Sequence, residues 1–255
     1  MKKNWVLSAS VLLLWTIVFS GSCKSDKPDP TPDPGIPFAK GADIGWLTEM
    51  EAAGKKFYNA AGTEMECIAL LKSLGMNSIR LRVWVNPSGG WNNAADVLAK
   101  ATRAKNAGMR LMIDFHYSDT WADPGQQAIP AAWAAQTLTE LQTSVYNHTY
   151  SVLASLKNNG IVPEWVQVGN ETNNGMLWPT GRASTSMSNF ASLVKQGYNA
   201  VKAVDPSIKV ILHLSNGYDN NLYRWIFDGM INNGVSWDII GMSLYPEPID
   251  WATRN

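Results

Sequence analysis

The sequence predicts an α/β fold, a TIM (β/α)8 barrel of which only about the first six βα units lie within the 255 residues. Short apolar runs rich in β-branched residues alternate with longer segments of helical period, a pattern typical of a parallel sheet with crossover helices. Polar and aromatic residues gather directly after the apolar runs, where a barrel of this kind collects its active site. The fold prediction rests on these two observations.

Six strands and five helices are predicted in alternation. The strands are expected at residues 41–44, 78–84, 110–115, 165–168, 209–214 and 238–242, and the helices near 64–74, 94–107, 138–157, 188–204 and 222–231. Gly75, Gly108 and Gly160 follow three of these helices at the position of a C-terminal cap, and Pro206 ends the fourth.

A complete barrel has eight units in about 250 residues, so the six units predicted here fall short of it. A six-stranded doubly wound sheet is the alternative. That fold would lead one to expect a glycine-rich phosphate-binding turn after the first strand, but the sequence at 41–46 is GADIGW and not GxGxxG. We therefore favour a barrel that stops two units early.

The N-terminal 37 residues are predicted to be an export signal and a linker. Residues 1–22 have the character of a lipoprotein-type signal peptide, since two lysines precede an apolar run at 5–19. The run ends in SGSC, which resembles a bacterial lipoprotein processing site with Cys23 as the acylated residue, although Ser20 departs from the usual aliphatic residue. Proline at 28, 30, 32, 34 and 37 favours an extended linker over 23–37, so the catalytic barrel is expected at 38–255.

This N-terminus predicts an exported, outer-membrane or cell-surface lipoprotein that contacts the membrane only through its lipid anchor. Ordinary cleavage and release, giving a secreted or periplasmic protein, is the alternative.

Composition points to a neutral partner. Lys plus Arg and Asp plus Glu are both 21, so no net field attracts nucleic acid or an anionic membrane surface. The 12 Trp and 8 Tyr suit the apolar faces of sugar rings, although most are expected to fill the core. The sequence has no HExxH, cysteine cluster, P-loop or dinucleotide fingerprint, so we expect no metal and no cofactor. We expect a monomer.

The clearest chemical motif is VQVGNE at 166–171, at the end of the fourth predicted strand. A carboxyl group held at a strand end and shielded by aromatic rings can protonate a leaving glycosidic oxygen, which predicts Glu171 as an acid/base. The adjacent Asn170 can hydrogen-bond a sugar 2-hydroxyl. Alone, an Asn-Glu pair is equally common as a helix cap followed by a first-turn acid.

Other strand ends contribute to the same mouth. The polar and aromatic residues expected there are Asp43, Trp46, Arg82, Trp84, Asp114, His116, Tyr117, Ser118, Asp119, Asn170, Glu171, His213, Ser243 and Tyr245.

Five stretches of the chain resemble the endo-β-1,4-galactanases of glycoside hydrolase family 53. They are GADIGWLTEME, SIRLRVWVNP, LMIDFHYSDTWADPGQQ, WVQVGNETNNGMLWPTG and DIIGMSLYP, and the resemblance runs from about Phe38 to Tyr245. It implies an arabinogalactan endo-β-1,4-galactanase, a retaining, endo-acting glycosidase whose partner is the β-1,4-galactan or arabinogalactan of plant pectin.

The resemblance also implies roles for particular residues. Glu171 becomes the acid/base and Asn170 its sugar-binding neighbour, and Arg82 would hold the carboxylate of the nucleophile. The residues that it places around the subsite where the bond breaks are Arg82, His116, His213 and Tyr245. The residues that it places along the cleft are Asp119, Trp121 and Trp178.

A retaining glycosidase needs a second carboxylate about 5–5.5 Å from the first. The resemblance puts this nucleophile at the end of the seventh strand, about residue 264 and so beyond Asn255. Glu247 follows the sixth strand between two prolines, which favours a rim loop over the nucleophile position. An open barrel also leaves the first and sixth strands with unpaired edges and exposed apolar faces, so we expect the 255-residue chain by itself to be poorly soluble and, without the nucleophile, inactive on galactan. A family calcium site, where present, is expected in the same absent C-terminal part.

Three functions remain open at this point. The first is the galactanase, present here as a fragment. The second is a non-catalytic, surface glycan-binding lipoprotein that kept the cleft. The third is a related barrel enzyme that cuts another neutral β-1,4 polymer, such as a mannanase or glucanase, since the Asn-Glu pair does not report the sugar.

Overall fold

The structure is a computed structural model that describes residue 35 and residues 37–245. The described residues from Ala39 onward belong to one compact unit. The predicted signal peptide, the lipidation site at Cys23 and Glu247 lie outside the described residues.

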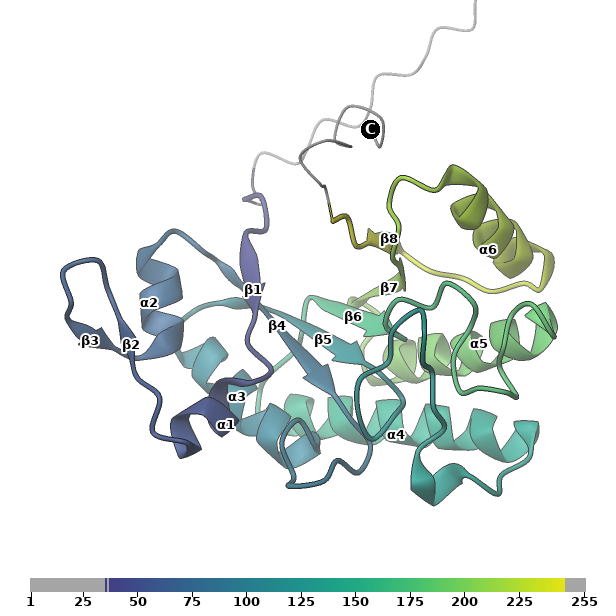
Figure 1. The fold of residues 1–255 in the computed structure, drawn as a ribbon, viewed down its shortest axis with the longest axis horizontal. Coiled ribbons are helices and arrows are strands. Elements are labelled where there is room, and N and C mark those ends of the chain that lie inside the picture. Colours follow the sequence, from purple (N-terminus) through teal and green to yellow (C-terminus); the bar gives the residue numbers. More distant parts are fainter. Residues whose placement is uncertain (1–34, 36, 246–255) are drawn as a thin grey trace, which may run out of the picture. The chain divides into compact units, whose positions relative to one another are not determined.

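Six parallel strands form the main sheet (Figure 1). They are β1 (Gly41–Asp43), β4 (Ser78–Val83), β5 (Arg110–Phe115), β6 (Trp165–Val168), β7 (Lys209–Leu214) and β8 (Ile239–Met242), and they lie side by side in that order. A doubly wound sheet reverses its strand order at a switch point, and this sheet does not. The doubly wound alternative is therefore wrong, and the chain forms the first six units of a (β/α) barrel.

Three long helices cover one face of the sheet, namely α3 (Ala94–Asn106), α4 (Leu138–Asn158) and α5 (Met187–Val204) (Figure 1). Right-handed crossovers between strands added in one direction place successive helices on the same side. The helix starts are locally encoded. Thr137 caps α4 in a capping box with Glu140, and Asn93 caps α3 by accepting from Asp96 N at 2.9 Å.

The strands alternate between a helix-facing side and an inner side. Ile79, Leu81 and Val83 of β4 are buried in the core beneath the helices. The inner side is partly polar, since Arg82 pairs in register with Asp114, and Asp114 with Gln167. Strand alternation therefore delivers a row of polar side chains to the inside of the half-barrel.

The connection between β1 and β4 holds elements that the sequence did not predict. These are α1 (Leu47–Ala52) and the hairpin of β2 (Phe57–Tyr58) and β3 (Glu64–Met65). The helix expected from residue 64 is α2 (Cys67–Ser73), so its predicted start was wrong. The physical reason is a cap, because the Glu66 carboxylate accepts from Ala69 N at 2.8 Å and fixes the helix start there.

The remaining elements are close to their predicted bounds. Three strands match them and three are one residue shorter, and the last helix, α6, spans Asn220–Asn232. A short 3-10 helix, η1 (Ala131–Trp133), lies in the loop after β5. Among the described helices, none combines the length and the hydropathy needed to cross a membrane.

Candidate active site

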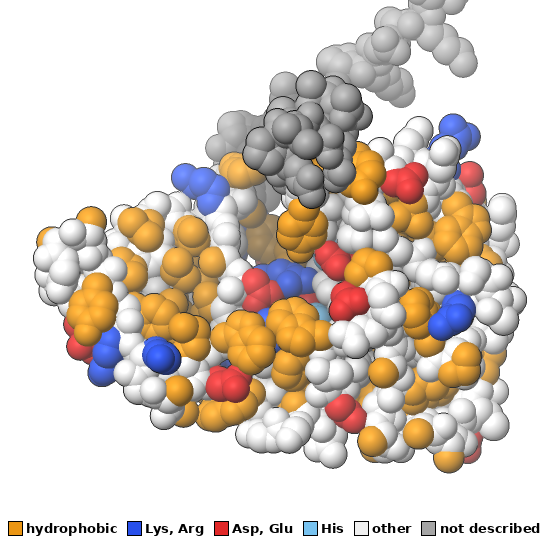
Figure 2. Space-filling model, viewed as in Figure 1, with side chains coloured by type: hydrophobic (Ala, Val, Ile, Leu, Met, Phe, Trp, Pro, Cys, Tyr) orange, Lys and Arg blue, Asp and Glu red, His pale blue; other side chains and the backbone are white. Residues whose placement is uncertain are grey.

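A pocket of about 430 Å³ opens at the C-terminal ends of the strands. Figure 2 shows the visible face hollowed at its middle, where basic and acidic side chains meet and hydrophobic side chains form the rim. The pocket is lined by Arg80, Trp121, Ala122, Asp123, Asn170, Glu171, His213, Ser243 and Tyr245. Strand ends far apart in the sequence thus meet at one mouth.

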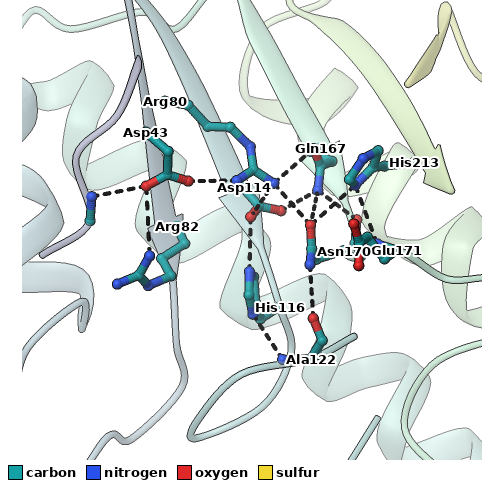
Figure 3. Close-up of polar contacts among 12 residues, drawn as sticks. Asp43, Arg80, Arg82, Asp114, His116, Ala122, Gln167, Asn170, Glu171 and His213 are labelled. Carbon is teal, nitrogen blue, oxygen red and sulfur yellow. Dashed lines mark hydrogen bonds and ion pairs between the residues drawn. The ribbon is translucent and has the colours of Figure 1, made fainter. Parts of the chain in front are cut away.

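Glu171 lies at a tight bend after β6. The bend places Gly169 at φ 84° and Glu171 at φ 46°, both in the left-handed region. A non-glycine residue there costs on the order of 1–2 kcal/mol, so its surroundings must hold it. His213 does so, because its Nδ1 accepts from Glu171 N at 3.2 Å and its carbonyl accepts from Thr172 N at 2.9 Å. The bend brings Glu171 to the pocket wall (Figure 3).

Asn170 is buried beside Glu171, with its side-chain amide in a fixed orientation. Its Oδ1 accepts from Arg80 Nη2 at 2.9 Å and from Gln167 Nε2 at 3.1 Å. Its Nδ2 donates to Ala122 O at 2.8 Å. Because donors surround the oxygen, the amide cannot flip without losing both bonds.

Arg80 is the centre of the polar network shown in Figure 3. Its Nη1 lies 2.5 Å from Asp43 Oδ2, and its Nη2 lies 2.7 Å from Asp114 Oδ2. Burial alone would raise the pKa of the Asp114 carboxyl group, but the positive charge of Arg80 and the contact with His116 hold that pKa below its ordinary value. The network therefore keeps a fully buried carboxylate charged beneath the pocket.

His116 is buried and has a defined tautomer. Its Nδ1 accepts from Trp84 Nε1 at 3.3 Å and from Ala122 N at 3.1 Å, while its Nε2 lies 2.9 Å from Asp114 Oδ2. Two donors at Nδ1 leave Nε2 as the protonated nitrogen, which donates to Asp114. His116 thus links the loop after β5 to the Arg80 network and does not line the pocket.

His213 lines the pocket as a neutral imidazole. Burial lowers its pKa to about 4. Its Nδ1 lies 3.2 Å from Glu171 N and 3.1 Å from Asn170 Oδ1, and its Nε2 lies 3.0 Å from Ser243 Oγ, a hydroxyl that can donate or accept.

Arg82 was expected near the bond-breaking subsite, but the structure places it outside the pocket. Its guanidinium carbon lies 4.6, 5.1 and 4.2 Å from the ring centroids of Trp46, Trp84 and Trp121. The Arg82 side chain is 2% exposed, and its Nη1 lies 3.6 Å from Asp43 Oδ1. Arg80, two residues earlier on the same strand, is the arginine that lines the pocket.

Asp119 and Trp178, expected to line the cleft, make structural contacts. Asp119 accepts from Asn86 N and from Ala131 N, each at 2.8 Å, and so ties together the loops after β4 and β5. The indole nitrogen of Trp178 donates to Asn174 O at 2.8 Å, and its ring lies against Arg182. Trp121 and Tyr245 do line the pocket, and they are 37% and 73% exposed.

The predicted site omitted Arg80 and Gln167, and it did not include Asp43 and Asp114 although both were noted at strand ends. A signal for them exists in the sequence. Asp114 and Gln167 interrupt the apolar runs LMIDF and WVQV, at positions that pair in register. A polar residue on the inner side of a barrel strand needs a charged or hydrogen-bonding partner there.

The acid stability of the protein should depend on its buried histidines. Burial lowers the pKa of both His148 and His213 to about 4, from 6.5. As the pH falls below about 6.5, these histidines are protonated in the unfolded chain but not yet in the folded protein. The free energy of unfolding therefore has its full value above about pH 6.5 and falls as the pH drops towards 4, by on the order of 3 kcal/mol for each histidine. Urea unfolding between pH 7 and 4 measures this loss.

The His148→Phe variant separates the two contributions. His148 lies in α4 against the rings of Phe115, Tyr117 and Trp133, and its Nε2 is buried with no hydrogen-bond partner among the described residues. A phenylalanine fits such a site without titrating, so the variant should lose about half of the pH dependence. An unchanged slope would show that His148 does not contribute.

In the part of the chain that the structure describes, no three His, Cys, Asp or Glu side chains are grouped so that they could hold a metal ion.

Comparison with known proteins identifies the family. The profile described as Glycosyl hydrolase family 53 matches residues 39–255. An uncharacterized protein of Niallia circulans is 42% identical over 82% of this chain, and an arabinogalactan endo-beta-1,4-galactanase of Thermothelomyces thermophilus is 38% identical over 81%. A solved GH53 catalytic domain from Ignisphaera aggregans is 41% identical over 84% of this chain, with a TM-score of 0.78. The chain spans 59%, 64% and 61% of these three proteins. With a matching profile over most of its length, the chain belongs to glycosyl hydrolase family 53.

Proposed function

We propose that the chain is the catalytic region of an endo-acting, retaining glycoside hydrolase that cleaves β-1,4-galactosidic bonds in galactan and type I arabinogalactan. The observation behind this proposal is the position of Glu171, at the end of β6 in a pocket rimmed by Trp121 and Tyr245. The name of the Thermothelomyces thermophilus relative, an arabinogalactan endo-beta-1,4-galactanase, supports the choice of substrate.

In this proposal Glu171 protonates the leaving glycosidic oxygen and then, as a carboxylate, activates the water that releases the product. Asn170 binds the sugar in the same subsite. Its Nδ2 carries two hydrogens, and Ala122 O accepts one of them, so the other can donate to a sugar hydroxyl. Arg80 and Gln167 fix that amide in advance, which lowers the cost of ordering it when the substrate binds.

The proposed nucleophile follows a strand C-terminal to β8, beyond residue 255. Among the described residues, the nearby carboxylates already have partners. Asp43 and Asp114 pair with Arg80, and Asp123 accepts from the amides of Gly125 and Gln126. Arg82 is covered by tryptophan rings, so Arg80 is the better candidate for contacting a second carboxylate in the pocket.

The proposal includes export as a lipoprotein anchored through Cys23, with the catalytic region monomeric. It is supported by the charged and apolar pattern of the first 23 residues. Cys23→Ser should move the protein from the membrane fraction of the cells that produce it to the soluble exported fraction. Membrane association that survives this substitution would reject the anchor.

The activity is tested on the product of the complete reading frame, with galactan, mannan and cellulose as parallel substrates. We expect a rapid fall in the viscosity of galactan and the release of short galacto-oligosaccharides, with retention of anomeric configuration in the first products seen by NMR. Hydrolysis of mannan or cellulose alone would reject the substrate. Binding to galactan without hydrolysis would instead support a glycan-binding protein.

A further inference from the structure

Two exposed indoles stand side by side at the mouth of the half-barrel. Trp121 lines the pocket and is 37% exposed, and Trp46, from the loop after β1, is 43% exposed. Their ring centroids are 6.0 Å apart, and the rings are tilted by 45°. We call this pair the tryptophan platform. It extends from the pocket that holds Glu171 along the C-terminal edge of the sheet.

Arg82 supports the platform from below. Its guanidinium lies over both rings, at 4.6 Å from Trp46 and 4.2 Å from Trp121, and its Nε and Nη2 are buried with no hydrogen-bond partner among the described residues. A guanidinium stacks favourably on indole faces. Because the side chain is only 2% exposed, a ligand in the cleft meets the rings and not the charge.

The loop that carries Trp46 is fixed to the barrel. Gly45 N donates to Asp43 Oδ1 at 2.9 Å, and Gly45 O accepts from the buried Lys100 Nζ at 2.8 Å. A Cβ at residue 45 would lie 2.6 Å from Arg82 Cζ, so glycine is needed for this close approach. Lys100 is held in turn by Asp96 Oδ2 at 2.7 Å. Trp46 is therefore exposed and yet anchored, which is the arrangement of a preorganised binding residue.

We propose that Trp46 is a substrate-binding residue, which extends the cleft beyond Trp121 by one further sugar unit. The inference rests on the proposed function and adds a subsite to it. Indole faces offer flat apolar surface, and a pyranose ring has one face of C–H groups that can pack on it. The second ring, next to the first and supported by the same guanidinium, gives a neutral polymer a second stacking position without any charged contact.

The test compares Trp46→Leu with Trp225→Leu in the product of the complete reading frame. Trp225 lies in α6 and is 42% exposed, so it matches Trp46 in residue type and exposure but lies outside the cleft. Trp46→Leu should raise KM for polymeric galactan about tenfold and leave kcat nearly unchanged. A short chromogenic galactobioside, which does not reach the added subsite, should be cleaved with an unchanged KM. Trp225→Leu should change neither value.

A second variant guards against a local folding defect. Trp46→Tyr keeps a flat ring over Arg82 and should recover most of the galactan affinity that Trp46→Leu loses. If Trp46 had only a structural role, Trp46→Tyr would recover the thermal stability lost in Trp46→Leu, and KM would be the same in both variants. The proposal is overturned if Trp46→Leu folds and binds galactan as the wild type does, measured by migration in galactan-containing native gels. Migration in this gel needs no catalysis, so it measures the contribution of Trp46 to binding separately from activity. A wild-type protein without galactanase activity would instead reject the proposed function.

Discussion

Replacing Glu171 by Gln should lower kcat on galactan by about a thousandfold, because the amide can neither protonate the leaving oxygen nor activate water. The substitution is isosteric and removes no hydrogen bond shown for the side chain, so the fold should be unaffected. The assay is the initial rate of galacto-oligosaccharide release by the product of the complete reading frame. An aryl galactoside with a good leaving group needs little protonation, so its first bond-breaking step should be slowed far less than cleavage of galactan.

The matched control is Glu164→Gln, at the opposite end of the same strand. Glu164 pairs with Arg110 at 2.5 Å at the N-terminal side of the sheet, far from the strand ends that form the pocket. It should leave kcat unchanged. A second readout is azide, a small nucleophile that needs no general base and should restore part of the rate of Glu171→Gln with the aryl substrate. Wild-type rates in Glu171→Gln would show that the acid/base lies elsewhere.

The sequence could predict the strands and the mouth because both depend on local patterns. Apolar runs define the strands, and parallel strands bring their C-terminal ends to one edge, so Glu171 and His213 could be expected to meet although 42 residues separate them. The Asn-Glu pair at the end of β6 needed no further information. Glu171 and His213 meet because β6 and β7 are neighbours in the sheet, and the alternation of strands and helices in the sequence already indicated that order.

The choice between Arg80 and Arg82 could not be made from the pattern. Both belong to β4, two residues apart, and so face the same side of the sheet. Arg82 is diverted by three tryptophans that come from separate loops, while Arg80 is drawn to Asp43 and Asp114 on the flanking strands. Long-range packing decides which guanidinium reaches the pocket, and no local periodicity reports it.

Asp119 illustrates the same limit in a loop. A carboxylate after a barrel strand suggests substrate binding, yet both of its oxygens accept backbone amides from other loops. Its partners, Asn86 and Ala131, are set by loop conformations that the sequence pattern does not encode. The β2–β3 hairpin was missed for a related reason, since two-residue strands are too short to show alternation.

Replacing Arg80 by Met should destabilise the protein by about 3 kcal/mol, because the fully buried carboxylate of Asp114 loses its closest positive charge. With Arg80 removed, burial should raise the pKa of Asp114, so protonation neutralises the unpaired buried charge and the stability deficit relative to the wild type should shrink as the pH falls through that higher value. The kcat should also drop more than KM changes, because Asn170 loses the donor that holds its amide in place. Urea unfolding at pH 7 and at pH 5, together with galactan kinetics, measures these effects.

The double variant Arg80→Met/Asp114→Asn shows whether the damage comes from the unpaired charge. Removing the buried carboxylate along with its partner should make the double variant more stable than the sum of the single effects predicts, by about 2 kcal/mol. Arg80→Lys should not replace the arginine, because one ammonium cannot reach Asp43, Asp114 and Asn170 together as the planar guanidinium does. Arg82→Met is the contrasting case, since it should loosen Trp46 and Trp121 and leave the pKa of Asp114 low. If instead Arg82→Met abolished activity and Arg80→Met did not, Arg82, as the sequence predicted, would be the arginine that acts in the pocket. The network around Asp114 would then be structural only.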